Sequence, residues 1–94
     1  MVHFLAHGKD DTVGVAVVDL KAGQTAEGWN SEKDEAVRAT ANSDIPLGHK
    51  IALTDIKQGD SVIKYNCPIG VASQNIRRGD HVHTHNLKSK RWQA

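Results

Sequence analysis

Cysteine is almost absent from this sequence, since Cys67 is the one thiol among 94 residues. A single cysteine excludes an internal disulfide and fits a reducing compartment. No second cysteine completes a Cys-x-x-Cys pair with it, so we expect Cys67 to be a structural residue rather than a redox centre.

Aromatic residues are scarce too, with two Trp, one Tyr and one Phe. Aliphatic side chains must therefore build the core of what is, by length, one small domain. Too few aromatics are present to stack on bases, and no nucleic-acid-binding motif is visible, which argues against a nucleic-acid partner. No apolar run is long enough to span a membrane and no secretory leader is visible, so we expect a soluble, cytoplasmic protein without a membrane partner.

The charge is uneven along the chain although the net charge is only +1. Residues 1–47 carry a net charge of −4, whereas residues 48–94 carry +5 and four of the six histidines. A cationic second half favours a small anionic ligand or an acidic partner surface.

Short β-branched segments separated by Gly, Asp and Pro predict a mainly β fold with little helix. We expect strands over residues 3–7 and 12–20, paired as a hairpin, and over 25–30, 49–53 and 61–65. Residues 31–41 are ambiguous, because Ser31 opens a helix-cap pattern, but a turn followed by a strand suits a β protein better. Residues 68–70, Pro-Ile-Gly, predict a further turn.

Two stretches repeat one pattern twenty residues apart, and a shorter stretch resembles them. Residues 55–62 and 75–82 both read polar, aliphatic, basic, any residue, Gly, Asp, any residue, Val, and residues 19–23 share the start of it. The aliphatic residue would anchor a corner in the core, Gly would adopt a backbone angle forbidden to other residues, and Val would begin the next strand. The sequence thus predicts a small domain of short strands and sharp glycine corners.

Three histidines lie within five residues, at His81, His83 and His85. On a β-strand over residues 79–86 their imidazoles would share one face, since alternate residues point the same way. Such a row suits a metal, an anion or proton transfer. The plainer alternative is a hydrated, titrating face, and a metal site would need a further ligand from elsewhere in the fold or from another chain.

Ordered motifs over nearly the whole chain resemble the small N-terminal domain of the altronate/galactarate dehydratase family. The matching segments are residues 11–16, 45–53, 56–65, 69–72 and 76–86. The resemblance implies a SAF-type, β-clip-like domain over residues 1–87, followed by a basic C-terminal tail over 88–94. Asn66 stands where the family usually has Gly, but asparagine tolerates the left-handed conformation, so the turn should survive.

The tail carries Lys88, Lys90, Arg91 and Trp92. A solvated tail is the plain interpretation. A docking segment is the sharper one, because Trp and Arg are common interface anchors.

The family's chemistry is β-elimination beside a carboxylate, dependent on a divalent metal, typically iron. Many members fuse this domain to a large catalytic portion. The two ends of this chain resemble instead the small subunits of members that eliminate sulfite from (2R)-3-sulfolactate to leave pyruvate. The resemblance thus implies a two-subunit lyase, inactive without its large (beta) subunit, which would hold most of the metal ligands.

For this chemistry we expect His83 and His85 to be catalytic at the subunit interface. His49, Lys50, Lys64, His81 and Asn86 are expected to bind the anionic hydroxy-acid substrate or line the interface. For Asn86 the alternative is a cap at a strand end, and for Lys64 a solvated strand end. A sugar-acid dehydratase subunit, a stand-alone anion- or metal-binding module and a purely structural subunit remain alternatives.

Overall fold

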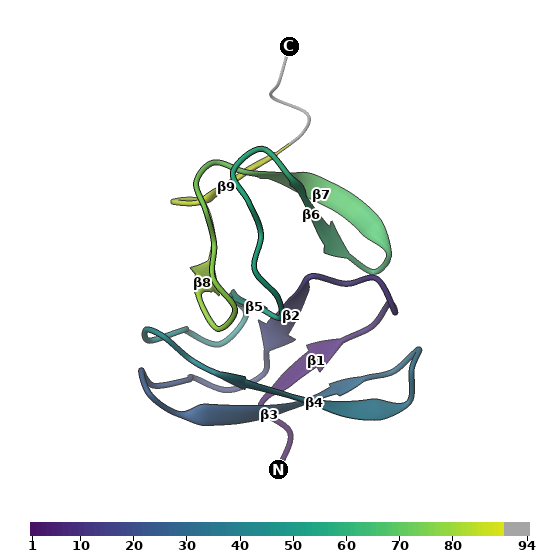
Figure 1. The fold of residues 1–94 in the computed structure, drawn as a ribbon. Helices are drawn as coiled ribbons and strands as arrows, with labels where there is room; N and C mark the ends of the chain where they lie inside the picture. The colour runs from purple at the N-terminus through teal and green to yellow at the C-terminus, as the bar shows by residue number, and fades with distance from the viewer. Residues whose placement is uncertain (90–94) are drawn as a thin grey trace.

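The computed structural model describes residues 1–89, in which every regular element is a β-strand (Figure 1). The nine strands are β1 (Phe4–Ala6), β2 (Val13–Ala16), β3 (Thr25–Asn30), β4 (Glu35–Thr40), β5 (Lys50–Ala52), β6 (Ser61–Lys64), β7 (Cys67–Ala72), β8 (His81–Val82) and β9 (Leu87–Ser89). The mainly β prediction is confirmed. Within residues 1–89 there is accordingly no helix that could cross a membrane.

The strands form two sheets. One has the order β4-β3-β1-β2-β5-β8, and the other has the order β6-β7-β9. In Figure 1 the six-stranded sheet occupies the lower part of the molecule and the three-stranded sheet the upper part. The predicted hairpin of the first two strands is confirmed, because β1 pairs antiparallel with β2, and β1 also pairs in parallel with β3.

Residues 31–34 form a turn that leads directly into β4, so the helix-cap alternative for this segment is not realised. Asp34 has a positive φ of 53° and completes the turn. β4 makes six cross-strand pairs with β3, whose alternate residues are buried, and this pairing decides the segment in favour of a strand.

Four turns with the same sequence pattern, which we call corners, connect the strands. The four corners associate in two pairs. Each corner has an aliphatic residue followed three positions later by a glycine with φ between 87° and 91°. The aliphatic residues pair by isolated bridges, Leu20 with Ile45 and Ile56 with Ile76. The fourth corner, at residues 44–48, lies outside the repeated stretches singled out in the sequence, although it carries the same polar-aliphatic-x-x-Gly pattern as the other three.

Within each pair the polar residue that begins one corner caps the other corner. Asp19 accepts a hydrogen bond from the Leu47 N–H, and Asp44 accepts one from the Ala22 N–H. Asp55 and Asn75 do the same for the N–H groups of Arg78 and Gln58. These reciprocal caps satisfy turn N–H groups that the strand ladders leave unpaired.

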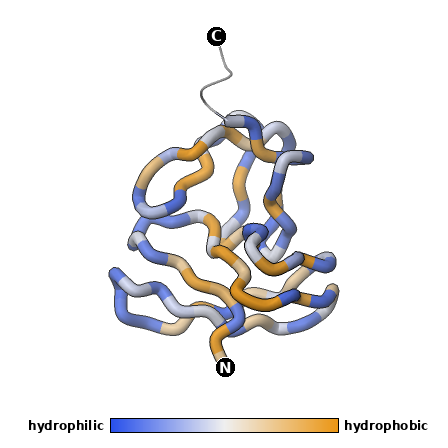
Figure 2. Tube along the Cα trace, turned by 180° about the vertical axis from the view of Figure 1, so that it is seen from behind, coloured by the Kyte–Doolittle hydropathy of each residue, from blue (hydrophilic) through white to orange (hydrophobic). Residues whose placement is uncertain are grey.

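Each pair of corners anchors its own hydrophobic cluster. Leu20 and Ile45 pack with Phe4 and Ile51 in the first cluster. Ile56 and Ile76 belong to the second cluster, where they are joined by Val13, Ala52, Val62, Ala72 and Val82. Figure 2 shows the corresponding alternation, with hydrophobic stretches along the strands and hydrophilic residues at the chain reversals of the rim. Aliphatic side chains build nearly all of this core, as the composition predicted.

The expected turn at residues 68–70 is wrong, because these residues lie inside β7. The chain reverses three residues earlier, where Tyr65 and Asn66 both adopt left-handed φ values of 55° and 60°. Two such residues form the tight hairpin turn that suits the twist of the flanking strands. Pro68 is accommodated by a register shift between Val62 and Ile63 on the facing strand.

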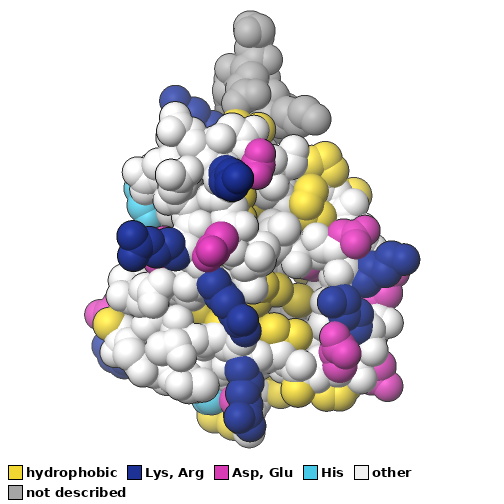
Figure 3. Space-filling model, viewed as in Figure 1, with side chains coloured by type: hydrophobic (Ala, Val, Ile, Leu, Met, Phe, Trp, Pro, Cys, Tyr) yellow, Lys and Arg dark blue, Asp and Glu magenta, His cyan; other side chains and the backbone are white. Residues whose placement is uncertain are grey.

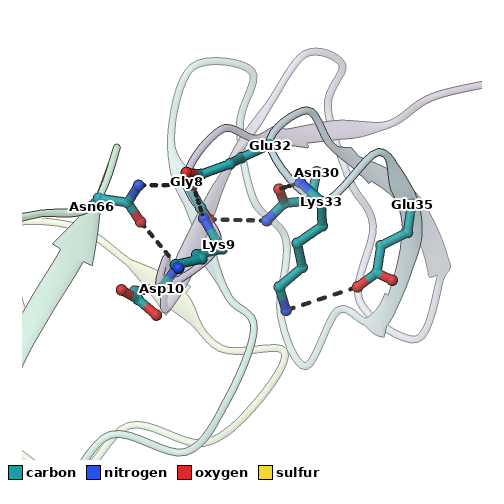
Figure 4. Close-up of polar contacts among 8 residues, drawn as sticks. All are labelled: Gly8, Lys9, Asp10, Asn30, Glu32, Lys33, Glu35 and Asn66. Carbon is teal, nitrogen blue, oxygen red and sulfur yellow. Dashed lines mark hydrogen bonds and ion pairs between the residues drawn. The ribbon is translucent and has the colours of Figure 1, made fainter.

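Asn66 joins the β6–β7 turn to two other loops (Figure 4). Its side-chain oxygen accepts a hydrogen bond from the Asp10 N–H at 2.9 Å, and its amide donates to Glu32 Oε2 at 2.7 Å. The backbone N–H of Asn66 also donates to Asp11 Oδ1 at 2.8 Å. The asparagine therefore preserves the turn, as expected, and adds contacts that a glycine could not make.

Replacing Asn66 with Gly is expected to lower the free energy of unfolding by about 1–2 kcal/mol. The variant keeps the left-handed backbone but loses both side-chain hydrogen bonds, each contributing about 1 kcal/mol. Urea unfolding of the two proteins measures the difference. A loss below about 0.5 kcal/mol would place these contacts among ordinary surface interactions.

The tail prediction falls mostly on residues 90–94, including Lys90, Arg91 and Trp92, which lie outside the described residues. Lys88 belongs to β9, which pairs with β7. The division of the chain after residue 87 stays a prediction.

Candidate functional site

The prediction of one continuous histidine strand is wrong. β8 contains only His81 and Val82, and residues 83–86 form a turn. Asn86 makes this turn: its side-chain oxygen accepts the His83 N–H at 3.0 Å, and its amide donates to the His81 carbonyl at 2.8 Å. Asn86 is buried, with 3% of its surface exposed, so its side chain positions the histidines on either side of it.

The imidazoles nevertheless converge, because the six-stranded sheet brings in a partner from another strand. β5 pairs with β8 through Lys50 with Val82 and Ile51 with His81, and this places His49 beside the histidine turn. His49 Nδ1 and His81 Nε2 share a hydrogen bond of 2.8 Å. The His83 ring stacks on the His49 ring with centroids 3.9 Å apart and planes 16° apart.

His85 lies at the side of this group rather than within it. Its ring is 5.1 Å from the His81 ring and tilted by 47°, and the residue is exposed. The structure therefore gathers His49, His81 and His83 tightly and leaves His85 at their edge.

A shallow cavity of about 220 Å³ lies beside one of these imidazoles, His83, and the cationic side chain of Lys50. It is lined by Lys50, His83 and Thr84, and by Ile69, Leu87 and Ser89. No pattern in the sequence singles out Thr84 or the aliphatic lining residues, since the tertiary fold alone brings them to this cavity.

Neither Lys50 nor Lys64 forms an ion pair with a carboxylate of residues 1–89. Between residues 1 and 89 the ion pairs join Lys33 to Glu35 and Arg38 to Glu27, and neither pair includes a residue of the site. Burial, together with the nearby charge of Lys64, lowers the pKa of the Lys50 ammonium. Lys64 itself lies with its Nζ 5.1 Å from the centre of the Tyr65 ring. Charges held together without a counter-ion favour an anionic ligand.

Two of the histidines are biased toward the neutral form. Burial lowers the pKa of His81, and the neighbouring imidazoles His85, His49 and His83 lower it further. Burial, His49 and Lys50 likewise lower the pKa of His83. A neutral imidazole can act as a base or as a metal ligand, whereas an imidazolium can do neither.

The donor set of His49, His81 and His83 also fits a divalent transition metal. One ring nitrogen from each residue lies within 4.8 Å of the others, and imidazole nitrogen is a ligand that iron and zinc accept. The sequence left the metal ligands of this chain undetermined. Among the described residues these three are the group that could contribute ligands to a metal.

Stability is expected to fall as the pH drops below about 6.5, the usual pKa of histidine. Because the pKa values of His81 and His83 are lowered in the folded protein, the unfolded chain binds protons first as the pH falls. The histidine contribution is therefore constant above that pH and becomes unfavourable below it. Urea unfolding between about pH 5 and pH 8 measures this, and a His81→Gln/His83→Gln variant should give a flatter profile over that range. An equal slope in the variant would assign the pH dependence to other groups.

The comparison with protein families identifies the fold and its relatives. Residues 2–90 match the model of the altronate/galactarate dehydratase SAF domain. The chain belongs to this family. The resemblance inferred from the ordered motifs is thus confirmed, and so is the SAF-type domain.

Relatives within the SAF-domain family fall into two kinds. The chain is 45% identical, over 97% of its own length and 98% of the relative's, to the (2R)-sulfolactate sulfo-lyase subunit alpha of Chromohalobacter salexigens. It is also 40% identical, over 95% of its own length, to the altronate dehydratase of Bacillus subtilis, of which it covers only 17%. The altronate dehydratase of Escherichia coli is 46% identical over 84% of the chain. The relatives are lyases and dehydratases, and the chain belongs among the subunits and domains of such enzymes.

Proposed function

We propose that this chain is the small subunit of a two-subunit lyase that eliminates sulfite from (2R)-3-sulfolactate to give pyruvate. The observation that carries the proposal is the cavity lined by Lys50 and by His83, which stacks on His49, where no ion pair joins Lys50 to a carboxylate of residues 1–89. The substrate is a dianion, with one carboxylate and one sulfonate. The near-complete coverage in both directions of the sulfo-lyase alpha subunit of C. salexigens supports the choice of substrate.

In the proposed reaction, Lys50 and Lys64 bind the anionic groups of the substrate and orient them toward the imidazoles. His83, which is biased toward its neutral form, accepts the proton from the carbon beside the carboxylate. The carbon–sulfur bond breaks, sulfite leaves with the electron pair, and the enol that remains converts to pyruvate. Sulfite needs less help from an acid than hydroxide does, so His85 would supply a proton mainly if the leaving group were hydroxide.

A divalent metal, typically iron in this family, would supply stabilisation of the negative charge that develops on the carboxylate side. We propose that the large subunit holds most of its ligands, with His49 and His81 as the residues of this chain that would add to them while His83 serves as the base. Of these, His81 is held by the Asn86 turn and by His49, so its position is fixed before a metal binds.

A second candidate is the small subunit of a sugar-acid dehydratase acting on altronate or galactarate. The identities of 40% and 46% to two altronate dehydratases favour it. The same lysines would bind the carboxylate of the sugar acid, but a hydroxide leaving group would require a proton donor at the position of His85.

The substrate can be tested by co-expressing this chain with the large lyase subunit encoded in the same genome. The purified complex is offered (2R)-3-sulfolactate, altronate and galactarate in the presence of ferrous iron. Release of sulfite supports the proposal, and formation of a 2-keto-3-deoxy acid without sulfite replaces it by the second candidate. A chain that forms no complex, yet binds sulfolactate or iron tightly by itself, would instead be a stand-alone binding module.

A further inference from the structure

A row of side chains crosses one face of the six-stranded sheet and ends at the proposed active site. Trp29 on β3 is in register with Leu5 on β1, and Leu5 is in register with Val15 on β2. Val15 is in turn opposite Lys50 on β5. Residues in register share one face of a sheet, so the row runs continuously from Trp29 to the cationic cavity.

This row is apolar and open to solvent. The exposed fractions are 48% for Leu5 and 37% for Trp29, and beside them Val17 and Tyr65 expose 38% and 55%. Leu5, Val15, Val17 and Tyr65 line one cavity of about 510 Å³. We call Leu5, Val15, Val17, Trp29 and Tyr65 the apolar row.

The apolar row exposes two of the few aromatic side chains of this protein. Within residues 1–89, Phe4 is fully buried, whereas Trp29 and Tyr65 both lie exposed at the apolar row. A domain short of aromatic residues gains more stability by burying them, and exposed Trp and Tyr beside aliphatic groups are typical of binding surfaces. In contrast, Figure 3 shows the opposite charges interspersed over much of one face of the molecule.

We propose that the apolar row is the surface on which the large catalytic subunit docks, so that docking also closes the cavity at Lys50 and His83. This inference rests on the proposed two-subunit lyase and assigns a surface to its partner. Two observations favour this occupant. The apolar row continues into the active site through Lys50 and through Lys64, which lies against Tyr65. In addition, the chain covers 17% of the B. subtilis dehydratase, so in that relative most of the enzyme lies outside the matched domain and is joined to it in one chain.

The test measures the affinity of the purified chain for the purified large subunit from the same genome, by calorimetry and sedimentation. Leu5→Asp and Val17→Asp each place a charge on the apolar row and are expected to weaken binding about 30-fold or more, as for residues central to an interface. Leu47→Asp is the matched control, since Leu47 is 62% exposed in the 44–48 corner and outside the apolar row. It should change the affinity less than about 3-fold. Circular dichroism and thermal unfolding of each free variant confirm that it is folded.

Unchanged affinity in both variants, or no binding by the unaltered chain, would overturn the docking surface. So would self-association of this chain that Leu5→Asp abolishes while the large subunit still binds, because the apolar row would then bind a second copy. The substrate assay separates this inference from the proposed function. A complex that depends on Leu5 and Val17 but releases no sulfite leaves the docking surface intact and rejects the sulfo-lyase.

Discussion

Replacement of His83 by Ala in the assembled enzyme is expected to lower kcat about 10²–10⁴-fold, the range for loss of a general base. His83 is the imidazole that both lines the cavity with Lys50 and stacks on His49 at 3.9 Å. Its lowered pKa keeps it in the form that can accept a proton at neutral pH. The measurement is sulfite release by the co-expressed complex, with complex formation checked by sedimentation.

The other histidines provide a graded set of controls for this variant. His85→Ala should have a smaller effect in a sulfo-lyase, because His85 lies at the edge of the cluster and sulfite needs little help from an acid. His3→Ala should leave kcat within about 3-fold, since His3 contacts the Glu27 backbone outside the site. Turnover by the His83→Ala complex at the level of the His3→Ala complex would remove His83 from the chemistry and favour a purely structural subunit.

Gly79→Ala is expected to lower the free energy of unfolding by about 2–5 kcal/mol, which for a small domain is a large part of the total. Gly79 has φ 91°, and a Cβ built on it would lie 2.0 Å from the Thr40 carbonyl oxygen. The variant therefore combines left-handed strain of about 1–2 kcal/mol with overpacking of about 1–3 kcal/mol. The contact is with backbone, so it cannot be relieved by a change of rotamer.

Gly59→Ala is the matched control for this variant. Gly59 occupies the same position in the partner corner with φ 89°, but a Cβ there meets nothing within 4 Å. It should cost only the conformational strain, about 1–2 kcal/mol. Urea unfolding of both variants gives the comparison. Equal losses would show that the 75–80 corner can move away from β4, and that the contact of Gly79 with Thr40 is not fixed.

The corners show how much of the fold the sequence carries by itself. An aliphatic residue, a glycine three positions later and a preceding Asp or Asn are enough to specify each corner, because anchor, backbone angle and cap are all local properties. Three of the four were therefore recognised as one pattern. Their reciprocal pairing was not predictable, because Asp19 caps Leu47 across 28 residues and the pairing partner is decided by packing.

The histidine segment shows the opposite case. Alternation predicted a strand with three imidazoles on one face, but Asn86 turns the chain after Val82 and bonds back to His81 and His83. A buried asparagine side chain competes with strand pairing for the same backbone groups, and a spacing rule does not include that competition. His49 was expected to bind the substrate or line the interface rather than to be catalytic. The pairing of β5 with β8 nevertheless places its ring closest to the His83 ring.

The sequence by itself thus determined the fold class, the charge distribution and the family: a mainly β domain with glycine corners, a cationic second half and a resemblance to lyases. The tertiary structure alone decided which groups act together. It brings His49 to the histidine turn, leaves Lys50 and Lys64 without a described counter-ion, and aligns Trp29, Leu5 and Val15 into a row that leads to Lys50. The physical reason is that the backbone preference of a residue depends mainly on its own type and on its neighbours in the sequence. A binding site, in contrast, depends on the register between strands that are distant in the sequence.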